Sequence, residues 1–147
     1  IPRFGPPPGR QKYRLRPGAY AVLIRDGRAL LTFQREPDPE FQLPGGGVDP
    51  GESPLAALHR EVHEETGWTL GSPRWLGTYR RYCYMPDYGF WAEKLCMVWL
   101  ARPILRRSAP SEPGHEARWM PLAQVDSLLP EAGMRAMFRR AMARPRG

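Results

Sequence analysis

Three carboxylates stand close together between positions 61 and 65 of the sequence. Glu61, Glu64 and Glu65 have the spacing i, i+3 and i+4, which places them on one arc of a helix. Like charges at this spacing repel, and the negative end of the helix dipole adds to the repulsion. A hard divalent cation such as Mg²⁺ or Mn²⁺, which prefers oxygen ligands, would make the arrangement favourable. The pattern therefore indicates either a metal site or a solvated acidic face.

These carboxylates belong to a segment with the end signals of a helix. Ser53 is a good N-cap, Pro54 suits the first helical position, and Gly67 suits the left-handed residue past the C-terminus. We therefore expect a helix over residues 54–66. Three apolar residues fall on one stripe that is expected to face a core, namely Leu55, Leu58 and Val62.

A run of three glycines, Gly45, Gly46 and Gly47, precedes the helix and follows a strand-like FQL. Glycine adopts backbone conformations that other residues avoid, so main-chain groups here can approach a phosphate or a metal ion closely. The same run is also typical of an ordinary turn. A strand, a glycine loop and a helix in this order would place backbone N–H and C=O groups beside the three carboxylates.

The whole segment resembles the signature of the Nudix (MutT-like) hydrolase family, G-x5-E-x7-R-E-U-x-E-E-x-G-U, in which U is a bulky aliphatic residue. The matching residues, all at the family's spacing, are Gly46, Glu52, Arg60, Glu61, Val62, Glu64, Glu65 and Gly67. Trp68 stands at the final U, a departure that concerns packing and not chemistry. An upstream LPGG and a later HEARWMPL are also similar to the family, so the resemblance covers roughly residues 18–130.

This resemblance implies an α/β (α+β) fold: the Nudix α/β/α sandwich, with a mixed sheet and the signature loop and helix. It implies metal-dependent hydrolysis of a diphosphate bond in a nucleoside diphosphate linked to another group X, by attack of water on phosphorus. The implied cofactor is Mg²⁺ or Mn²⁺, and the implied partner is a small nucleotide or nucleoside diphosphate derivative. The signature indicates the reaction, whereas the identity of X stays open.

The resemblance also implies roles for single residues. Glu64 and Glu65 correspond to metal ligands, and the carbonyl of Gly45 to a backbone ligand. Glu61 corresponds either to a ligand or to the general base. Arg60 is expected to orient these carboxylates and not to touch the substrate.

Further residues of the motif have structural roles by the same resemblance. Glu52 is expected to hold the loop against the helix, and Gly46, Gly47 and Gly67 to shape the backbone.

Outside the motif, Glu116 resembles an acidic residue that some family members place before a tryptophan to complete the metal site. Here two extra residues separate it from Trp119. Glu112, in the same segment, is the rival candidate for the general base, and Glu93 is a third candidate for a role in the site.

Alternating residues predict two strands, over residues 74–85 and 90–101, joined by a turn at 86–89. This hairpin carries Tyr82, Tyr84 and Tyr88. Aromatic rings can stack on a nucleobase, so the three tyrosines are candidate substrate contacts. Packing within the sheet is the alternative interpretation.

The remaining elements follow from similar signals. Residues 19–24 and 28–34 are predicted strands, joined by Asp26-Gly27, a strong hairpin signal. A loop is expected over residues 102–115. The other predicted elements are a strand at 116–120 and helices at 121–129 and 131–143.

The formal net charge of +7 is concentrated at the two ends of the chain. Residues 1–17 hold five basic residues and no acidic one, and residues 134–147 hold five arginines and no acidic one. We expect a flexible basic N-terminal arm over residues 1–17 and a single Nudix domain over residues 18–147. Basic ends can neutralise the phosphates of nucleic acid, so contact with RNA is one interpretation. Solvated, solubilising ends are the other.

The composition of the 147 residues, 41% of them hydrophobic, is that of one domain able to bury its own core. Cys83 and Cys96 lack the spacing of a zinc site or a disulfide framework. No apolar run approaches the length of a membrane span, and the first residues lack the apolar segment of a secretory signal. We therefore expect a cytoplasmic protein without membrane contact, either a monomer or a homodimer.

Two alternatives to hydrolysis of a small nucleotide remain. The chain can be a Nudix fold that senses a nucleotide without cleaving it, although the presence of all four motif glutamates and Arg60 favours an enzyme. It can also be a pyrophosphohydrolase of RNA 5′ ends that holds the RNA with its basic arms.

Overall fold

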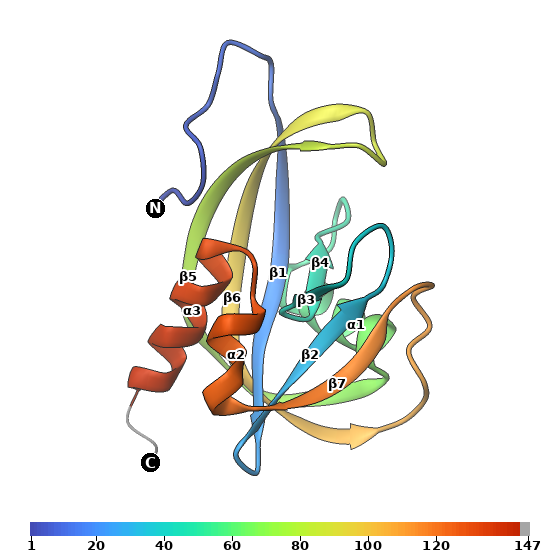
Figure 1. Cartoon of the computed structure of the whole chain (residues 1–147). Coiled ribbons are helices and arrows are strands. Elements are labelled where there is room, and N and C mark those ends of the chain that lie inside the picture. Colours follow the sequence, from blue (N-terminus) through green and yellow to red (C-terminus); the bar gives the residue numbers. More distant parts are fainter. Residues whose placement is uncertain (145–147) are drawn as a thin grey trace.

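The computed structural model describes residues 1–144, which form a seven-stranded mixed sheet and three helices (Figure 1). The strands are β1 (Arg14–Arg25), β2 (Arg28–Gln34), β3 (Glu40–Gln42), β4 (Gly45–Gly47), β5 (Trp68–Met85), β6 (Phe90–Arg106) and β7 (Glu116–Pro121). The helices are α1 (Pro54–Thr66), α2 (Leu122–Leu128) and α3 (Ala132–Ala143). Arg146, which was counted with the basic C-terminal residues, lies outside the described residues.

The first strand, β1, is the centre of the sheet. It pairs in parallel with β6 from Arg14 to Leu23, and antiparallel with β2 and β4. The strand order is β3-β2-β1-β6-β5, with β4 joined to β1 and β7 joined to β2. Because β4 pairs directly with β1, the three glycines are fixed to the most central strand of the molecule.

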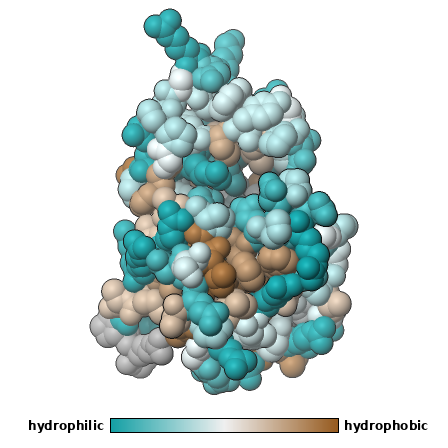
Figure 2. All heavy atoms as spheres, viewed as in Figure 1, coloured by the Kyte–Doolittle hydropathy of each residue, from teal (hydrophilic) through white to brown (hydrophobic). Residues whose placement is uncertain are grey.

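Alternate side chains of β1 face two separate cores. Ala19, Ala21 and Leu23 pack with the buried face of α1. Tyr20 and Val22 point the other way and pack with α2 and α3. The sheet is therefore covered by α1 on one face and by α2 and α3 on the other, so the predicted α/β/α sandwich is confirmed. Figure 2 shows hydrophilic residues over much of the face toward the viewer, with a hydrophobic area in its middle.

Helix α1 has the ends that the sequence predicts. The side chain of Ser53 accepts a hydrogen bond from the N–H of Ala56 at 3.1 Å, and Gly67 adopts a left-handed φ of 78°. Leu58 and Val62 are fully buried, but Leu55 is 44% exposed, so its predicted place in the core is wrong. The first buried residue is Ala57, because the sheet covers α1 only beyond its first turn.

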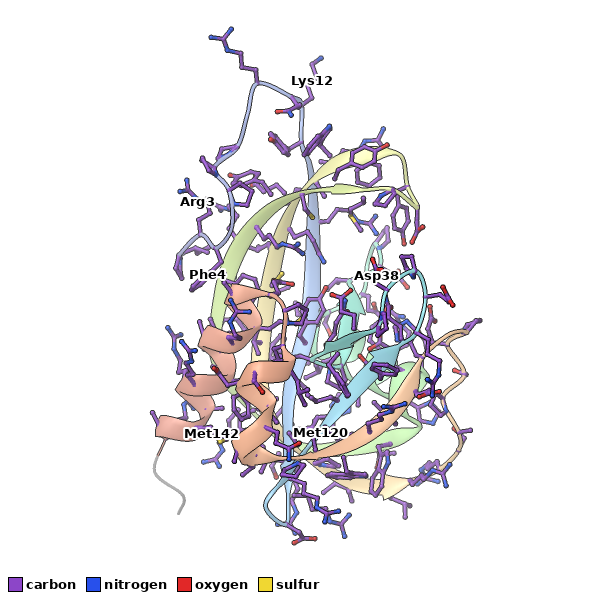
Figure 3. The ribbon with its side chains drawn as sticks, viewed as in Figure 1. Arg3, Phe4, Lys12, Asp38, Met120 and Met142 are labelled. Atoms are coloured by element: carbon purple, nitrogen blue, oxygen red, sulfur yellow. The ribbon has the colours of Figure 1, made fainter. Side chains whose placement is uncertain are left out.

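The N-terminal segment contacts the domain more extensively than a free arm would. β1 begins at Arg14, inside the segment predicted to be an arm, because residues from Arg14 onward pair with β6. The N–H of Phe4 donates to the carbonyl of Arg80 at 3.0 Å, and the Phe4 ring packs edge-on against Tyr79. Figure 3 shows Phe4 turned toward the domain and Lys12 pointing away from it.

Several strands differ in length from the prediction, while their order does not. The hairpin at Asp26-Gly27 is confirmed, with left-handed φ values of 52° and 76°. The strand predicted from residue 74 begins already at Trp68 as β5, because Leu70 and Gly71 pair with β6, and a register shift lies between Gly71 and Arg74. The predicted loop at 102–115 is strand as far as Arg106. The glycines form a short strand instead of a loop.

No helix in residues 1–144 combines the length and the apolar character needed to cross a membrane.

Candidate active site

The glycine strand β4 lies directly beside the last turn of α1. The N–H of Gly45 donates to Oε2 of Glu65 at 3.0 Å. On its other side β4 pairs with β1, with Gly45 opposite Tyr20 and Gly47 opposite Gly18. Main-chain groups of the glycines and carboxylates of the helix therefore share one small region.

Glu65 is the most deeply buried of the three helix carboxylates. Its side chain is 11% exposed, against 15% for Glu61 and 35% for Glu64. The pKa of Glu65 is raised to about 8, chiefly by burial and in part by the charges of Glu61, Glu112 and Glu64, while the N–H of Gly45 opposes the rise. Burial thus makes the negative charge of Glu65 costly, and the neighbouring carboxylates add to this cost.

Glu61 lies against the backbone of Gly46. A Cβ atom at position 46 would stand 2.5 Å from the carboxyl carbon and from Oε2 of Glu61, so a side chain at position 46 would displace this carboxylate. Burial raises the pKa of Glu61, and the hydrogen bond from Arg60 opposes the rise. The second glycine of the run therefore allows the close approach of strand and helix.

Arg60 is the cation that holds the acidic residues together. Its Nε and Nη2 donate to the two oxygens of Glu52 at 2.8 and 2.9 Å, and this contact lowers the pKa of Glu52 to about 2. Its Nη1 donates to Glu61 at 3.0 Å and to Glu64 at 3.3 Å, and its Nη2 donates to the carbonyl of Gly47 at 3.0 Å. Its Nη2 also lies 3.4 Å from Oδ2 of Asp49, so one guanidinium serves four carboxylates and ties the loop to the helix.

The donor set of this cluster suits a hard divalent cation. Its candidate donors are all oxygens, from Glu61, Glu64 and Glu65 and from the carbonyls of β4. Within residues 1–144, no three acidic, histidine or cysteine side chains converge closely enough to form a complete metal site. Magnesium sites commonly use only one or two carboxylates, with water and substrate phosphates as the other ligands, so a partial protein shell fits this ion.

His115 is a neighbour of the cluster that sequence reasoning missed. Its Nδ1 lies 3.9 Å from Oε1 of Glu65, and its side chain is 17% exposed. This nitrogen is buried and has no hydrogen-bond partner in the described part of the chain. The only signal in the sequence was its position beside Glu116 in the segment HEARW.

The segment after β6 crosses the C-terminal end of α1. The N–H groups of Ser111 and Glu112 both donate to the carbonyl of Glu64, at 2.8 and 2.9 Å. The charge of Glu112 contributes to the raised pKa values of Glu61 and Glu65. The structure therefore brings Glu112 to the cluster.

Glu116, by contrast, points to the other face of the sheet. Ala117 and Trp119 pack with the core under α1, so the alternation of strand β7 turns Glu116 away from α1. Its carboxylate pairs with Arg118 at 2.8 Å and with Arg35 at 3.2 Å, and the hydrogen bond from Arg118 lowers its pKa. The structure does not bring Glu116 to the helix carboxylates.

The three candidate tyrosines lie in the outer half of the β5–β6 hairpin. Tyr82 packs edge-on against Tyr13, and Tyr84 against Trp91, with ring centres 5.0 and 5.3 Å apart. Tyr88 lies in the turn, where its side chain lines a cavity of about 200 Å³. Only Tyr88 of the three carries an arginine over its ring in the described structure.

Glu93, the third acidic candidate, stands opposite Tyr82 in the hairpin and pairs with Arg80 at 3.5 Å. It is therefore part of the hairpin and makes no ion pair or hydrogen bond with the helix carboxylates among residues 1–144.

Arg16 links the hairpin tip to the glycine strand. Its guanidinium carbon lies 4.8 Å from the centre of the Tyr88 ring. Its Nη2 lies beside Gly47, 3.7 Å from where a Cβ atom at that position would be. Arg14 lies over Phe90 at 4.6 Å. Figure 2 shows that the surface is hollowed below the hairpin tip. Cationic and aromatic groups thus extend from this tip to the edge of the carboxylate cluster.

Comparison with solved structures agrees with this fold. A MutT NUDIX hydrolase from Burkholderia pseudomallei is 29% identical, with a TM-score of 0.66 and coverage of 86% of this chain and 98% of that chain. A NUDIX hydrolase from Nitrosomonas europaea has a TM-score of 0.74 at 20% identity, with coverage of 88% and 90%. The second likeness concerns the fold alone.

Comparison of sequences gives relatives with named activities, among them an RNA pyrophosphohydrolase and a phosphonate hydrolase. An RNA pyrophosphohydrolase from Legionella pneumophila (strain Corby) is 37% identical over 73 residues, which cover 50% of this chain and 41% of that protein. The CMP-5'-(N-acetyl-N-hydroxy-3-aminopropyl)phosphonate hydrolase of Streptomyces rubellomurinus is 32% identical over 120 residues, 77% of this chain and 55% of that protein. This chain thus spans about half the length of these relatives.

The NUDIX domain itself matches residues 14–141, from the first residue of β1 into α3. The match includes the glycine strand, the carboxylate helix and Arg60, whose contacts are described above. The chain belongs to the NUDIX domain family.

Proposed function

We propose that this protein is a metal-dependent hydrolase that cleaves a diphosphate bond in a nucleoside diphosphate linked to another group. The observation that carries the proposal is the excess of negative charge at the junction of β4 and α1. Arg60 neutralises part of the charge of Glu52, Glu61 and Glu64, whereas Glu65 accepts, among residues 1–144, a single hydrogen bond from the N–H of Gly45, with Nδ1 of His115 3.9 Å away. A divalent cation would compensate for the remainder and would attract a diphosphate substrate.

In this proposal Glu64 and Glu65 hold the cation, together with a main-chain oxygen of Gly45. Bound Mg²⁺ or Mn²⁺ would neutralise the phosphate charge and make water a better nucleophile. Arg60 fixes the direction of the carboxylates, because it reaches two of them and the loop at once. The glycine backbone leaves room for the phosphates next to the cation.

The general base is assigned to Glu61 or to Glu112. Burial raises the pKa of Glu61 above its usual range, and a raised pKa makes a carboxylate a better acceptor of a proton from the attacking water. Glu112 is more exposed and close enough to influence the same carboxylates. We leave Glu116 out of the ligand set because Arg35 and Arg118 hold it on the other face.

A second candidate function is hydrolysis at the 5′ end of RNA. The observation in its favour is the position of Arg14 and Arg16 on β1, where they stack on Phe90 and Tyr88 next to β4. These arginines and rings could contact the phosphates and bases that follow a 5′ end. The named activity of the Legionella relative is consistent with this candidate.

A hydrolysis panel tests both candidates. Purified protein is incubated with Mg²⁺ or Mn²⁺ and with nucleotide sugars, ADP-ribose, dinucleoside polyphosphates, nucleoside triphosphates and 5′-triphosphorylated RNA, and the products are separated by chromatography. Selective turnover that is lost in Glu64→Gln supports the enzyme and identifies the substrate class. Tight metal-dependent binding of a nucleotide without turnover would instead indicate a sensor.

The salt dependence of RNA binding tests the RNA candidate separately. Affinity for RNA should fall steeply with salt, because each neutralised phosphate adds to the slope of log K against log salt. The double variant Arg14→Gln/Arg16→Gln should reduce that slope and leave turnover of small nucleotides nearly unchanged. A slope that does not change in this variant would exclude these arginines from RNA contact.

A further inference from the structure

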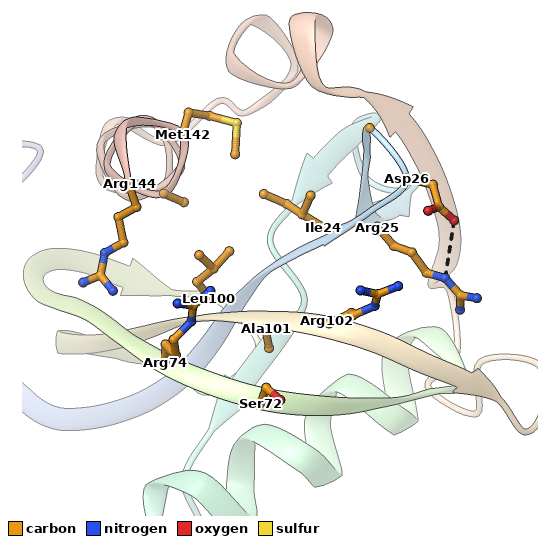
Figure 4. A pocket seen from close by; sticks show the side chains of 12 residues that line it. Ile24, Arg25, Asp26, Ser72, Arg74, Leu100, Ala101, Arg102, Met142 and Arg144 are labelled. Atoms are coloured by element: carbon orange, nitrogen blue, oxygen red, sulfur yellow. Dashed lines mark ion pairs between the residues drawn. The ribbon is translucent and has the colours of Figure 1, made fainter. Parts of the chain in front are cut away.

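A groove lined by four arginines lies at the end of the sheet opposite to the β5–β6 turn. It has a volume of about 440 Å³ and lies between the β1–β2 turn, the first part of β5, the middle of β6 and the end of α3. Its arginines are Arg25, Arg74, Arg102 and Arg144. Figure 4 shows their side chains spread in a row along the groove, with Arg144 and Arg74 at one end and Arg102 and Arg25 at the other.

This groove is separate from the candidate active site. None of the described residues that line it belongs to β4, to α1 or to the segment that crosses the end of α1. Ile24, Leu100 and Met142, which form its apolar part, pack with the core under α2 and α3. The apolar part of the groove therefore lies on the face of the sheet that is turned away from the helix carboxylates, whereas Arg25, at one end, lies over Trp68 on the other face.

The positive charge of the groove is only partly neutralised within residues 1–144. Asp26 is the one acidic residue among its described lining residues, and it pairs with Arg25 at 3.6 Å. Arg144 donates to the carbonyl of Trp75 at 2.7 Å. In the same range, the guanidinium groups of Arg74 and Arg102 have neither an ion pair nor a hydrogen bond to the protein.

Gathered arginines repel each other unless an anion is present. Guanidinium groups bind phosphates in a planar, bidentate geometry, so several arginines in a row suit a ligand with more than one phosphate. Leu100 on β6 and Met142 across the groove on α3 line its apolar part, which suits a flat, weakly polar ring system (Figure 4). The volume lies within the usual range of small-ligand sites, about 300–1,000 Å³.

We propose that this groove is a second nucleotide site, which binds a nucleoside polyphosphate without hydrolysing it. The phosphates lie along Arg74 and Arg102, and the base contacts Leu100 and Met142. The site needs no metal ion, because arginines supply the positive charge. It is independent of the hydrolysis proposed above, since no residue is shared between the two places.

The test is calorimetric titration of the full chain with α,β-methylene-ATP in the presence of EDTA. Chelation removes the contribution of a metal-dependent site, and the methylene bridge prevents cleavage between the first two phosphates. The variant Arg74→Glu/Arg102→Glu should lower the affinity at least tenfold, whereas Arg10→Glu/Arg107→Glu should not. Arg10 and Arg107 are exposed and lie outside the groove, so the control makes the same change in net charge.

Three results would overturn the proposal. The first is an equal loss of affinity in both double variants, which would show only a general effect of charge. The second is tripolyphosphate binding as tightly as the nucleotide analogue, which would show that the base makes no contact. The third is a single-stranded RNA binding at least tenfold more tightly than the analogue through Arg74 and Arg102, which would make the groove a nucleic-acid site.

Two further measurements distinguish loss of binding from loss of folding and from the effect of added negative charge. Thermal unfolding of every variant shows whether the fold is retained, and Arg74→Gln/Arg102→Gln repeats the test without introducing negative charge. Loss of binding in this neutral variant, at an unchanged melting temperature, supports the proposal. Retention of full affinity in a folded neutral variant contradicts it.

Discussion

The main-chain N–H of Gly45 donates to Oε2 of Glu65 across 3.0 Å, and this contact joins the glycine strand to the last turn of α1. It connects the most buried carboxylate of the candidate site to the strand that is paired with β1. A carboxylate held in this way keeps its place when no metal is bound. The same burial makes its negative charge costly.

Glu65 should make the metal-free protein less stable as the pH rises. Its pKa is raised from 4.5 to about 8 in the folded protein, so between these values the folded state binds more protons than the unfolded state. Stability is therefore highest below the unfolded value and falls as the pH rises through about 8, by up to about 1.4 kcal/mol per pH unit. Glu65→Gln removes this titration and should be the more stable protein at pH 8.

Urea unfolding in EDTA at pH 5.5 and pH 8 measures this effect as the difference between wild type and variant. Glu116→Gln serves as the control, because the pKa of Glu116 is lowered and not raised. If the difference between wild type and Glu65→Gln were the same at both pH values, Glu65 would not have the raised pKa.

Arg60→Ala should destabilise the metal-free protein more than the loss of an ordinary surface ion pair does. Its side chain is 30% exposed and serves Glu52, Glu61 and Glu64. Breaking partly buried, charged hydrogen bonds costs roughly 1–3 kcal/mol. Arg139→Ala is the matched control, because Arg139 makes a two-point contact with Asp126 but is 67% exposed.

Arg139→Ala should lower the free energy of unfolding by no more than about 1 kcal/mol, because exposed ion pairs contribute no more than this. Chemical denaturation of both variants in EDTA gives the comparison. Equal losses in the two variants would show that the contacts of Arg60 have no special importance for the fold.

Gly46→Ala should reduce kcat while the protein remains folded. The added Cβ would stand 2.5 Å from the Glu61 carboxylate and would displace it. A displacement of about 1 Å in a catalytic group can lower the rate about a hundredfold. The neighbouring Gly47→Ala is the control, because the nearest atom to its added Cβ is Nη2 of Arg16 at 3.7 Å, an ordinary contact.

Steady-state kinetics and far-UV circular dichroism of the two glycine variants provide the measurement. Gly47→Ala should change kcat far less than Gly46→Ala does. A reversed order of the two effects would mean that the position of Glu61 does not limit the reaction.

If Glu112 is the general base, Glu112→Gln should lower kcat at least tenfold, because a proton-transfer group typically contributes about 10²–10⁴. Glu116→Gln should change it less than threefold, because ion pairs with Arg35 and Arg118 hold Glu116 on the other face of the sheet. A pH–rate profile of Glu112→Gln separates the two possible bases. Loss of the acidic limb assigns the base to Glu112, and an unchanged limb assigns it to Glu61.

Local signals predicted the parts of the fold that short segments determine. Ser53, Pro54 and Gly67 gave the bounds of α1, and Asp26-Gly27 gave the first hairpin, because capping and turn conformations depend on a few neighbouring residues. The spacing of the helix carboxylates likewise follows from the helix alone. The grouping of Glu61, Glu64 and Glu65 was therefore accessible from the sequence.

Features that depend on distant partners were not accessible in this way. The parallel pairing of β1 with β6 joins Arg14 to Ala92, and it turns part of the predicted arm into a strand. Glu116 was assigned to the site by its resemblance to an acidic residue that some family members place before a tryptophan, but its place in β7, opposite Phe33, sets the face on which it lies. His115 reaches Glu65 only because the segment after β6 folds over α1.

The central claim is that the carboxylates of α1 hold the divalent ion that hydrolysis requires. The most direct measurement is a titration with Mn²⁺ followed by electron paramagnetic resonance, with turnover measured on the same samples of wild type and Glu64→Gln. We predict that the variant loses Mn²⁺ affinity at least tenfold and loses turnover with it, at an unchanged melting temperature. Wild-type Mn²⁺ binding together with wild-type turnover in Glu64→Gln would contradict the claim.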